Sequence, residues 1–557
     1  MDSSFVFGRL LDAERGGHFT IDAPDVESIH QAYVDNTNVI KTIFHTSRGA
    51  FSVTDFAPRY RQYERYYKPT KVFRIIRAIS GEPLVRVVCE PVGDYGRKKL
   101  ARWSASNHIA WQGLDAPLRL TTNAPLTAIE DGRPFLLDSD VYLALTYGQP
   151  LETDLVETAE GSLRRTIAYW QRWVKHTNVP RDYQEPVIRS ALALKLHQFE
   201  DTGALLAATT TSLPEFPGSG RNWDYRFCWL RDAYFTLNAL ERLGQFEEME
   251  LFIDYLRNLC ENYGDELRPV YTAAGDTDME EHILEHLPGF RGDGPVRIGN
   301  QAHEHVQNDV YGEMILAVSR VLLDARFVSS SAIAGTHRLV HRLLAQIERR
   351  LEEPDAGLWE LRGTQQIHAF TLLMHWAGAR RAREIGAALG DASLEKRGER
   401  IERAARALLL EKCWNPNPGV LTQAAGKTNL DAALLLAVHL GFFEGDEAKA
   451  RTHVQAIAEG LAVDGGYLRR YDVADDFGLQ EAAFTVCNFW LVEALARVGR
   501  KDEARAIFDR LLACRNTFGL LSEDILPTTN ELSGNFPQTY SHVGMINAAF
   551  RLSRDWG

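Results

Sequence analysis

Two glutamates lie in loops where a carboxyl group could act in acid–base chemistry. Glu360 directly follows Trp359 in a glycine-bounded turn, and a neighbouring indole would strip water from the carboxyl, raise its pKa and keep a proton available. Glu523 lies in an acidic pair after Ser522, where one ionised carboxylate could activate water. The alternatives without chemistry are an ordinary surface glutamate at 360 and a helix cap formed by Ser522.

Cleavage of a glycosidic bond with inversion needs one protonated and one ionised carboxyl, separated by about 6.5–9.5 Å so that a water fits between them. Glu360 and Glu523 are 163 positions apart (523 minus 360) in the sequence. Only a fold that brings distant loops to one face could pair them.

The segment Arg221–Asp232 concentrates three cations, two aspartates and four aromatic residues. Aromatic faces stack on the apolar faces of sugar rings, while arginine and aspartate hydrogen-bond the surrounding hydroxyls. The composition therefore favours a carbohydrate pocket, to which Gly465–Asp472 could add Arg470. An ion-pair network at a helix N-terminus, with Asp232 complementing the helix dipole, explains the first segment equally well.

The secondary structure that must position these loops changes from strands to helices along the chain. Up to about residue 150, short apolar or alternating runs are broken by Gly, Pro, Asp and Asn, which predicts antiparallel strands in a β-sandwich. The clearest predicted strands are His18–Ile21, Phe51–Phe56, Val72–Ile76, Leu84–Val88 and Val141–Tyr147. Helical spacing then begins in Gly161–Thr177, which we interpret as a linker helix.

After about residue 183 the apolar periodicity is helical almost to the end. One stripe joins Ile401 to Leu409, another runs from Leu230 to Leu240 before Gly244, and a third runs from Phe484 to Val498 before Gly499. Roughly 370 residues of such helices exceed a simple bundle. A ring of helical hairpins accommodates them. We therefore expect a domain of residues 1–155, a helical linker of 156–182 and a helical domain of 183–557.

Composition excludes several classes of protein. The 557 residues carry a formal net charge of −13 with a pI near 5.8, which argues against nucleic acid or an anionic membrane as partner. Neither a basic leader followed by an apolar run nor a membrane-spanning run is present, so a cytoplasmic location is expected. The six scattered cysteines lack metal-ligand spacing and are read as reduced and mostly buried.

At its aromatic and acidic loops the sequence resembles glycoside hydrolase family 15, over nearly the whole chain. The matching segments occur in the family's order and include a trehalase-like N-terminal domain at Val6–Leu11 and Thr54–Phe56. The others are Thr210–Glu215, Asn222–Asp232, Pro295–Asn300, Asp309–Glu313, Gly357–Gly363, Phe489–Val492, Ser522–Glu523 and Asn535–His542. Residues 524–531 depart from the family's usual continuation, and no role is assigned to Gln301–Gln307.

The resemblance implies a β-sandwich followed by an (α/α)₆ barrel. It places the general acid on Glu360 and the general base on Glu523. The resemblance also assigns binding of the terminal glucose to Tyr225, Trp229, Arg231, Asp232 and Arg470. Trp359, beside the acid, completes the expected set of substrate-binding residues.

The expected activity is inverting hydrolysis of an α-glucoside, with release of β-glucose from non-reducing ends of trehalose or short α-glucans. The alternatives are a transglycosylase or phosphorolytic enzyme on a related barrel, and a non-catalytic sugar-binding protein. No metal or cofactor is required by the sequence, although phosphate or magnesium dependence is an option among trehalase-like members. The expected partner is a small carbohydrate, and homo-oligomerisation stays open.

Overall fold

The computed structural model describes residues 2–327 and 330–556. They divide into two compact units. One contains Ser3–Thr177 together with Leu287–Gly292, and the other contains the remainder of the described chain from Asn178 onward. No helix among the described residues is both long enough and apolar enough to cross a bilayer.

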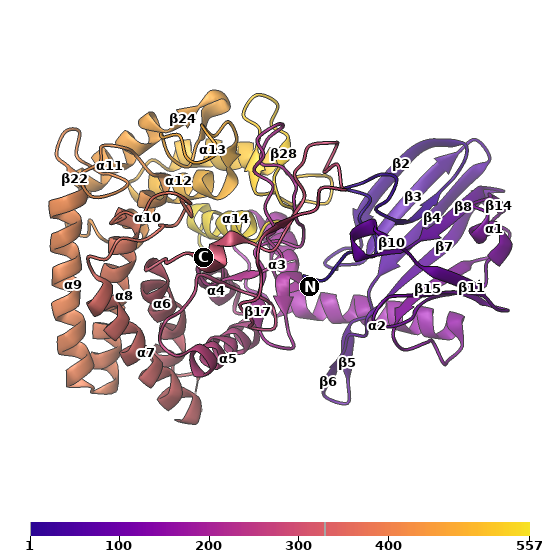
Figure 1. The fold of residues 1–557 in the computed structure, drawn as a ribbon, viewed down its shortest axis with the longest axis horizontal. Helices are drawn as coiled ribbons and strands as arrows, with labels where there is room; N and C mark the ends of the chain where they lie inside the picture. Colours follow the sequence, from indigo (N-terminus) through magenta and orange to yellow (C-terminus); the bar gives the residue numbers. More distant parts are fainter. Residues whose placement is uncertain (1, 328–329, 557) are drawn as a thin grey trace. The chain divides into compact units, whose positions relative to one another are not determined.

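The first unit is built on two antiparallel sheets (Figure 1). The larger has the strand order β11-β12-β13-β15-β7-β4-β3-β2. The smaller has the order β1-β8-β14. The larger sheet comprises β2 (Val26–Tyr33), β3 (Ile40–Thr46), β4 (Gly49–Phe56), β7 (Lys71–Gly81), β11 (Ala101–Ser104), β12 (His108–Gln112), β13 (Leu118–Thr122) and β15 (Val141–Tyr147). The smaller comprises β1 (His18–Asp22), β8 (Leu84–Glu90) and β14 (Phe135–Leu136).

One apolar core joins the two sheets. Val85 and Val87 of β8 are fully buried in the same cluster as Phe51 of β4 and Leu143 of β15. Alternate residues of β8 are buried, as the period of two in a strand requires. The unit is therefore a β-sandwich, and each of the five strands predicted from the sequence overlaps an observed strand.

The helix predicted around residues 161–177 is α2 (Leu155–Lys175), which starts six residues earlier than expected. Its N-terminus is capped by Asp154, whose side chain accepts the Glu157 N–H at 2.8 Å. Leu163 of α2 packs against Phe73 and Tyr142 on the other face of the larger sheet. This helix is thus part of the sandwich unit.

The second unit is helical, and alternate helices form a closed series (Figure 1). Each helix in the series contacts the next, and the last contacts the first. The series is α4 (Leu230–Leu243), α6 (Asp309–Leu323), α8 (Ala369–Leu389), the short pair η3 (Ala432–Leu435) and α10 (Leu436–His439), α12 (Thr485–Arg497) and α14 (Thr539–Leu552). The order agrees with the expected ring of helical hairpins.

A second set of helices packs against members of this inner series. It comprises α3 (Gln184–His197), α5 (Phe246–Tyr263), α7 (Ser330–Arg350), α9 (Ala392–Cys413), α11 (Glu447–Gly460) and α13 (Lys501–Ala513). Close contact between α6 and α8 depends on glycine, because a Cβ at Gly312 would lie 2.1 Å from the Met374 carbonyl oxygen.

The loops before the inner helices bring the chemical residues to one end of the series. Arg231 and Asp232 occupy the first turn of α4, whereas Glu360 precedes α8 and Arg470 precedes α12. Glu523 lies in the loop before α14. Helix N-termini therefore surround the candidate site.

Candidate active site

The turn that carries Glu360 is held in an uncommon backbone conformation. Glu360 has a φ of +60°, in the left-handed region that non-glycine residues rarely adopt. At Gly357, which has a φ of +68°, a Cβ would lie 2.7 Å from the His368 ring. Asp355 fixes the turn by accepting the Gly357 N–H at 3.1 Å and the Thr371 hydroxyl at 2.9 Å. Burial raises the pKa of Asp355 to about 7.

Three donors converge on one oxygen of Glu360. Its Oε1 accepts the indole N–H of Trp229 at 2.7 Å, Nη2 of Arg231 at 3.2 Å and Nε2 of Gln307 at 3.2 Å. Arg231 also donates to Oε1 of Gln307 at 2.6 Å, which fixes the orientation of both donors. Because Oε1 is occupied, the proton of a neutral Glu360 would reside on Oε2.

A pocket of about 60 Å³, here called the inner pocket, collects most of the predicted residues. Seven of the eight residues expected from the sequence line it, namely Tyr225, Trp229, Arg231, Asp232, Trp359, Glu360 and Arg470. The rings of Tyr225 and Trp229 meet edge to face, with centroids 5.4 Å apart. The inner pocket thus combines aromatic walls with hydrogen-bonding groups, which suits a sugar ring.

Arg231 and Asp232 form the charged part of the inner pocket. Arg231 is 4% exposed and donates to Oδ2 of Asp309 at 3.2 Å. Burial raises the pKa of Asp232 to about 7, and the charge of Arg231 opposes the rise. Burial likewise raises the pKa of Asp309, again against Arg231. The buried Arg231 cation therefore lies close to several carboxyl groups and favours their ionised forms.

Glu523, the eighth predicted residue, lies outside the lining of the inner pocket. It is fully buried, its N–H donates to the Asn535 carbonyl at 3.0 Å, and its Oε2 accepts the Asn535 N–H at 3.2 Å. Ser522 donates to the Asp524 carbonyl at 2.7 Å and precedes β27 (Asp524–Ile525). Since a strand follows, the helix-cap explanation of this loop is wrong.

Glu523 belongs to a cluster with Glu215 and Asp524, whose carboxylate oxygens lie within 4.8 Å of one another. Glu215 pairs with Arg470 and accepts the indole N–H of Trp223 at 3.0 Å. Burial raises the pKa of Glu523 to about 8, the charge of Glu215 adds to the rise, and Arg470 opposes it. Oε1 of Glu523 is buried without a hydrogen-bond partner among the described residues.

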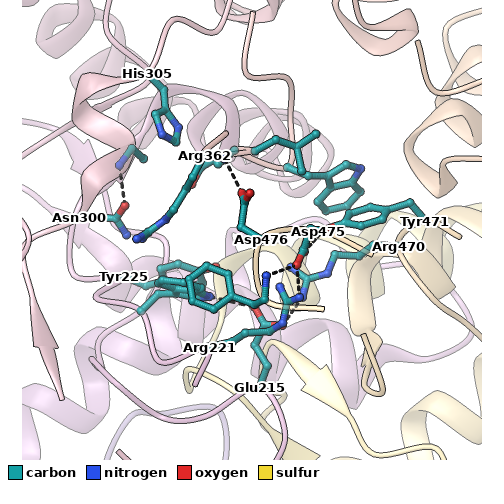
Figure 2. Close-up of a pocket in the computed structure, with 16 residues that line it drawn as sticks. Glu215, Arg221, Tyr225, Asn300, His305, Arg362, Arg470, Tyr471, Asp475 and Asp476 are labelled. Atoms are coloured by element: carbon teal, nitrogen blue, oxygen red, sulfur yellow. Dashed lines mark hydrogen bonds and ion pairs between the residues drawn. The ribbon is translucent and has the colours of Figure 1, made fainter. Parts of the chain in front are cut away.

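A second pocket of about 70 Å³, here called the outer pocket, shares Tyr225, Trp359, Glu360 and Arg470 with the inner one. Figure 2 shows the residues that are particular to it, which come from several loops. They are Glu215, Arg221, Trp223, Asn300, Ala302, His305, Leu361, Arg362, Tyr471, Asp475, Asp476 and Phe477. Glu360 therefore lines both pockets, as a group acting on a bond between two rings would.

Several of these residues had no role in the sequence-based prediction. Gln307 binds both Arg231 and Glu360, and His305 lines the outer pocket, although both belong to a segment left without a role. Burial lowers the pKa of His305, and the charge of Glu360 opposes this. The feature of the sequence that could have singled out Gln307 is its position two residues before Asp309, the first residue of α6.

Among the described residues, two groups of side chains have ligand types and spacing that could hold a cation. In the cluster of Glu215, Glu523 and Asp524, Arg470 already provides positive charge. In the other, Nε2 of His341 forms a hydrogen bond with Oδ2 of Asp391 at 2.7 Å, and Nε2 of His337 lies 3.1 Å from the same oxygen.

The chain matches known protein families over most of its length. Residues 181–550 match the model of glycosyl hydrolases family 15, and residues 1–132 match that of the trehalase-like N-terminal domain. A trehalase of Mycolicibacterium smegmatis is 34% identical over 593 residues, covering 99% of this chain and 87% of the relative. A trehalase of Thermoplasma volcanium is 30% identical over 570 residues, covering 99% and 88%.

Among solved structures, a bacterial glucoamylase complexed with acarbose has the same fold. Its TM-score is 0.67 at 14% identity, and the match covers 96% of this chain and 85% of that one. Because the family model spans most of the helical unit and the trehalases align over almost the whole chain, this chain belongs to glycosyl hydrolases family 15, the glycoside hydrolases of trehalase and glucoamylase type.

Proposed function

We propose that this chain is an inverting hydrolase of trehalose, with Glu360 as general acid and Glu523 as general base. The observation that carries the proposal is the position of Glu360, which lines both pockets and has Oε1 saturated by donors. The choice of trehalose is supported by the printed names of the relatives that align over the whole chain.

In the proposed reaction, the terminal glucose occupies the inner pocket, where Arg231 and Asp232 bind its hydroxyls and Tyr225 and Trp229 form its aromatic wall. Oε2 of Glu360 protonates the glycosidic oxygen, because Oε1 is held by Trp229, Arg231 and Gln307. The leaving sugar occupies the outer pocket. Fixed donors on Oε1 also stabilise the carboxylate once its proton has left.

Glu523 would deprotonate the water that attacks the opposite face of the anomeric carbon. Its Oε2 is held by the Asn535 N–H, whereas Oε1 is buried without a hydrogen-bond partner among the described residues and is the atom that we assign to the water. Arg470 favours the ionised form that a base requires. Inversion would release β-glucose from the cleaved residue.

The experiment measures glucose release from trehalose, maltose, isomaltose and maltopentaose, with the anomer followed by NMR. Wild type is compared with Glu360→Gln, Glu523→Gln and Glu215→Gln, the last a buried carboxyl of the same cluster. From trehalose we expect immediate β-glucose from the attacked ring and an equal amount of α-glucose from the leaving ring. Both should be lost in the first two variants and retained at a reduced rate in the third. Initial release of α-glucose alone from trehalose would contradict inversion, and an active Glu523→Gln would remove that residue as base.

The remaining alternatives give different products in the same assay. A phosphorolytic enzyme would form a sugar phosphate only when inorganic phosphate is added, and a transglycosylase would make longer sugars from maltose. A sugar-binding protein would show heat on titration with trehalose without any turnover. Hydrolysis that is independent of phosphate supports the proposal.

A further inference from the structure

The outer pocket is lined by Glu360 and by residues of the loop that follows Arg470. The inner and outer pockets have similar volumes, about 60 and 70 Å³, and share Glu360. A site that holds a sugar chain would need a groove that continues past the leaving ring. Here two loops contribute to the lining, one after Glu360 with Arg362 and one after Arg470 with Asp475 and Asp476 (Figure 2).

The first closing contact is an ion pair at the base of the second loop. Arg221 pairs with Asp475, and both side chains are almost completely buried, at 4% and 6% exposure. Arg221 also donates to the Gly478 carbonyl at 3.0 Å, and Oδ1 of Asp475 accepts the Phe477 N–H at 2.8 Å. Loss of a partner would leave a buried charge, so this end of the loop is fixed.

The second contact joins the two loops at the rim of the outer pocket. The backbone N–H of Arg362 donates to Oδ2 of Asp476 at 2.8 Å. The Arg362 guanidinium binds Glu281 at 2.8 and 3.1 Å and lies over the ring of Trp223, 4.7 Å from its centroid. Figure 2 shows Arg362 and Asp476 facing each other across this rim.

An aromatic contact completes the wall. Phe477 meets Trp223 edge to face with centroids 5.0 Å apart, and the Arg362 guanidinium lies 5.5 Å from the Phe477 ring. The Arg362 guanidinium thus contacts both rings, which also contact each other. Aromatic and cation–π contacts of this kind add to burial and disfavour opening of the loop.

We propose that Asp476 and Phe477, held by Arg362 and Arg221, close the outer pocket behind a single sugar ring and so restrict the enzyme to disaccharides. The inference rests on the proposed function, in which the leaving sugar occupies the outer pocket. It assigns chain-length specificity to the loop of residues 472–480 and makes longer α-glucans poor substrates because their third ring meets this wall.

The test compares kcat/KM for trehalose, maltose and maltopentaose in wild type, Asp476→Ala and Phe477→Ala. Leu479→Ala is the matched control, since Leu479 lies in the same loop, is 59% exposed and is absent from the pocket lining. In wild type we expect maltopentaose to be the poorest of the three. Opening the wall should raise kcat/KM for maltopentaose relative to maltose about ten-fold or more, an effect of the size that pocket contacts give. Leu479→Ala should leave the ratio unchanged.

Calorimetric titration of maltopentaose and maltose into a Glu360→Gln background gives a second readout that needs no turnover. Variants that open the wall should gain affinity for maltopentaose, and circular dichroism shows that they are folded. The proposed closure would be wrong if wild type had equal kcat/KM for maltose and maltopentaose, or if the ratio of these values were unchanged in both Asp476→Ala and Phe477→Ala. Either result would leave the proposed hydrolysis of trehalose unaffected. If wild type hydrolyses no sugar, the proposed function fails, and the titration still decides whether the wall excludes a third ring.

Discussion

The indole N–H of Trp229 donates to Oε1 of Glu360 at 2.7 Å, the shortest of the three contacts to that oxygen. The two residues are 131 positions apart: Trp229 ends the short strand β18 (Cys228–Trp229) directly before α4, and Glu360 lies in the turn before α8. Since Oε1 must accept charge when Glu360 gives up its proton, this donor acts on the reacting group itself.

Substitution Trp229→Phe keeps an aromatic wall and removes the donor. A hydrogen bond to a charged group contributes about 1.5–3 kcal/mol, so we expect kcat on trehalose to fall roughly 10- to 100-fold with a smaller change in KM. Steady-state kinetics measures both parameters. Trp414→Phe, in β22 (Trp414–Asn415) and outside both pocket linings, is the control. Equal loss in both variants would mean that folding, not the bond, is affected.

The cluster around Glu523 predicts a rate that depends on pH. Burial raises the pKa of Glu523 to about 8, and a general base works only when ionised. We therefore expect kcat/KM to increase as the pH rises through that value. Arg470→Gln removes the opposing cation and should move the rise to higher pH, whereas Glu215→Gln removes a negative neighbour and should move it to lower pH.

Profiles of log kcat/KM between about pH 5 and pH 10 measure both shifts. The two substitutions differ in sign, which separates electrostatic control of the base from general damage to the site. Shifts in the same direction, or none in either variant, would show that the observed titration belongs to another group.

Much of the fold could be predicted because the apolar periodicity of a segment and the turn residues at its ends are local features of the sequence. The largely apolar run Val141–Tyr147 is β15 in full, and the helical stripe that ends at Gly244 is α4, where Gly244 adopts a φ of +73°. The start of α2 was placed too late, because Leu155 and its cap Asp154 carry little periodic signal. The six cysteines are unpaired and buried, as expected.

More of the residues that line the inner pocket than of those particular to the outer pocket could be predicted from the sequence. Arg231, Asp232 and Glu360 lie in segments whose composition is unusual by itself, and the family pattern covers them. Arg362, Asp475 and the donor Gln307 act through partners far away in the sequence, so no local spacing marks them. Ion pairs between loops are tertiary features, and composition alone does not identify the partners.

Gly534 is expected to be needed for the position of Glu523. It has a φ of +77°, and a Cβ there would lie 2.8 Å from both Cβ and Oε2 of Glu523. Gly534→Ala should displace the base and lower kcat by about 100-fold, a loss typical of small misplacements. Gly499→Ala is the matched control, because Gly499 has a φ of +89° with nothing within 4 Å of its added Cβ.

Both glycine substitutions carry a similar backbone cost, roughly 1–2 kcal/mol for a left-handed conformation. Gly534→Ala must in addition displace Glu523, so its thermal midpoint should fall further than that of Gly499→Ala, and only Gly534→Ala should lose turnover. Retained kcat in Gly534→Ala would show that Glu523 tolerates displacement or is not the base. A loss of kcat in Gly499→Ala would show that strain alone explains the effect.

Gly312 is expected to be essential for the packing of α6 on α8. Its added Cβ would meet the Met374 carbonyl oxygen at 2.1 Å, and a Cβ at Gly378 would lie 2.7 Å from the Gly312 Cα. These contacts are between backbones, which yield less readily than side chains, so Gly312→Ala should cost about 1–3 kcal/mol or more.

Gly161→Ala in α2 meets only the flexible end of Arg165 at 3.7 Å and should instead gain up to about 1 kcal/mol from helix propensity. Thermal unfolding followed by circular dichroism compares the two variants with wild type. A Gly312→Ala protein as stable as wild type would show that the two helices can separate without cost, and the close approach would then not define the ring.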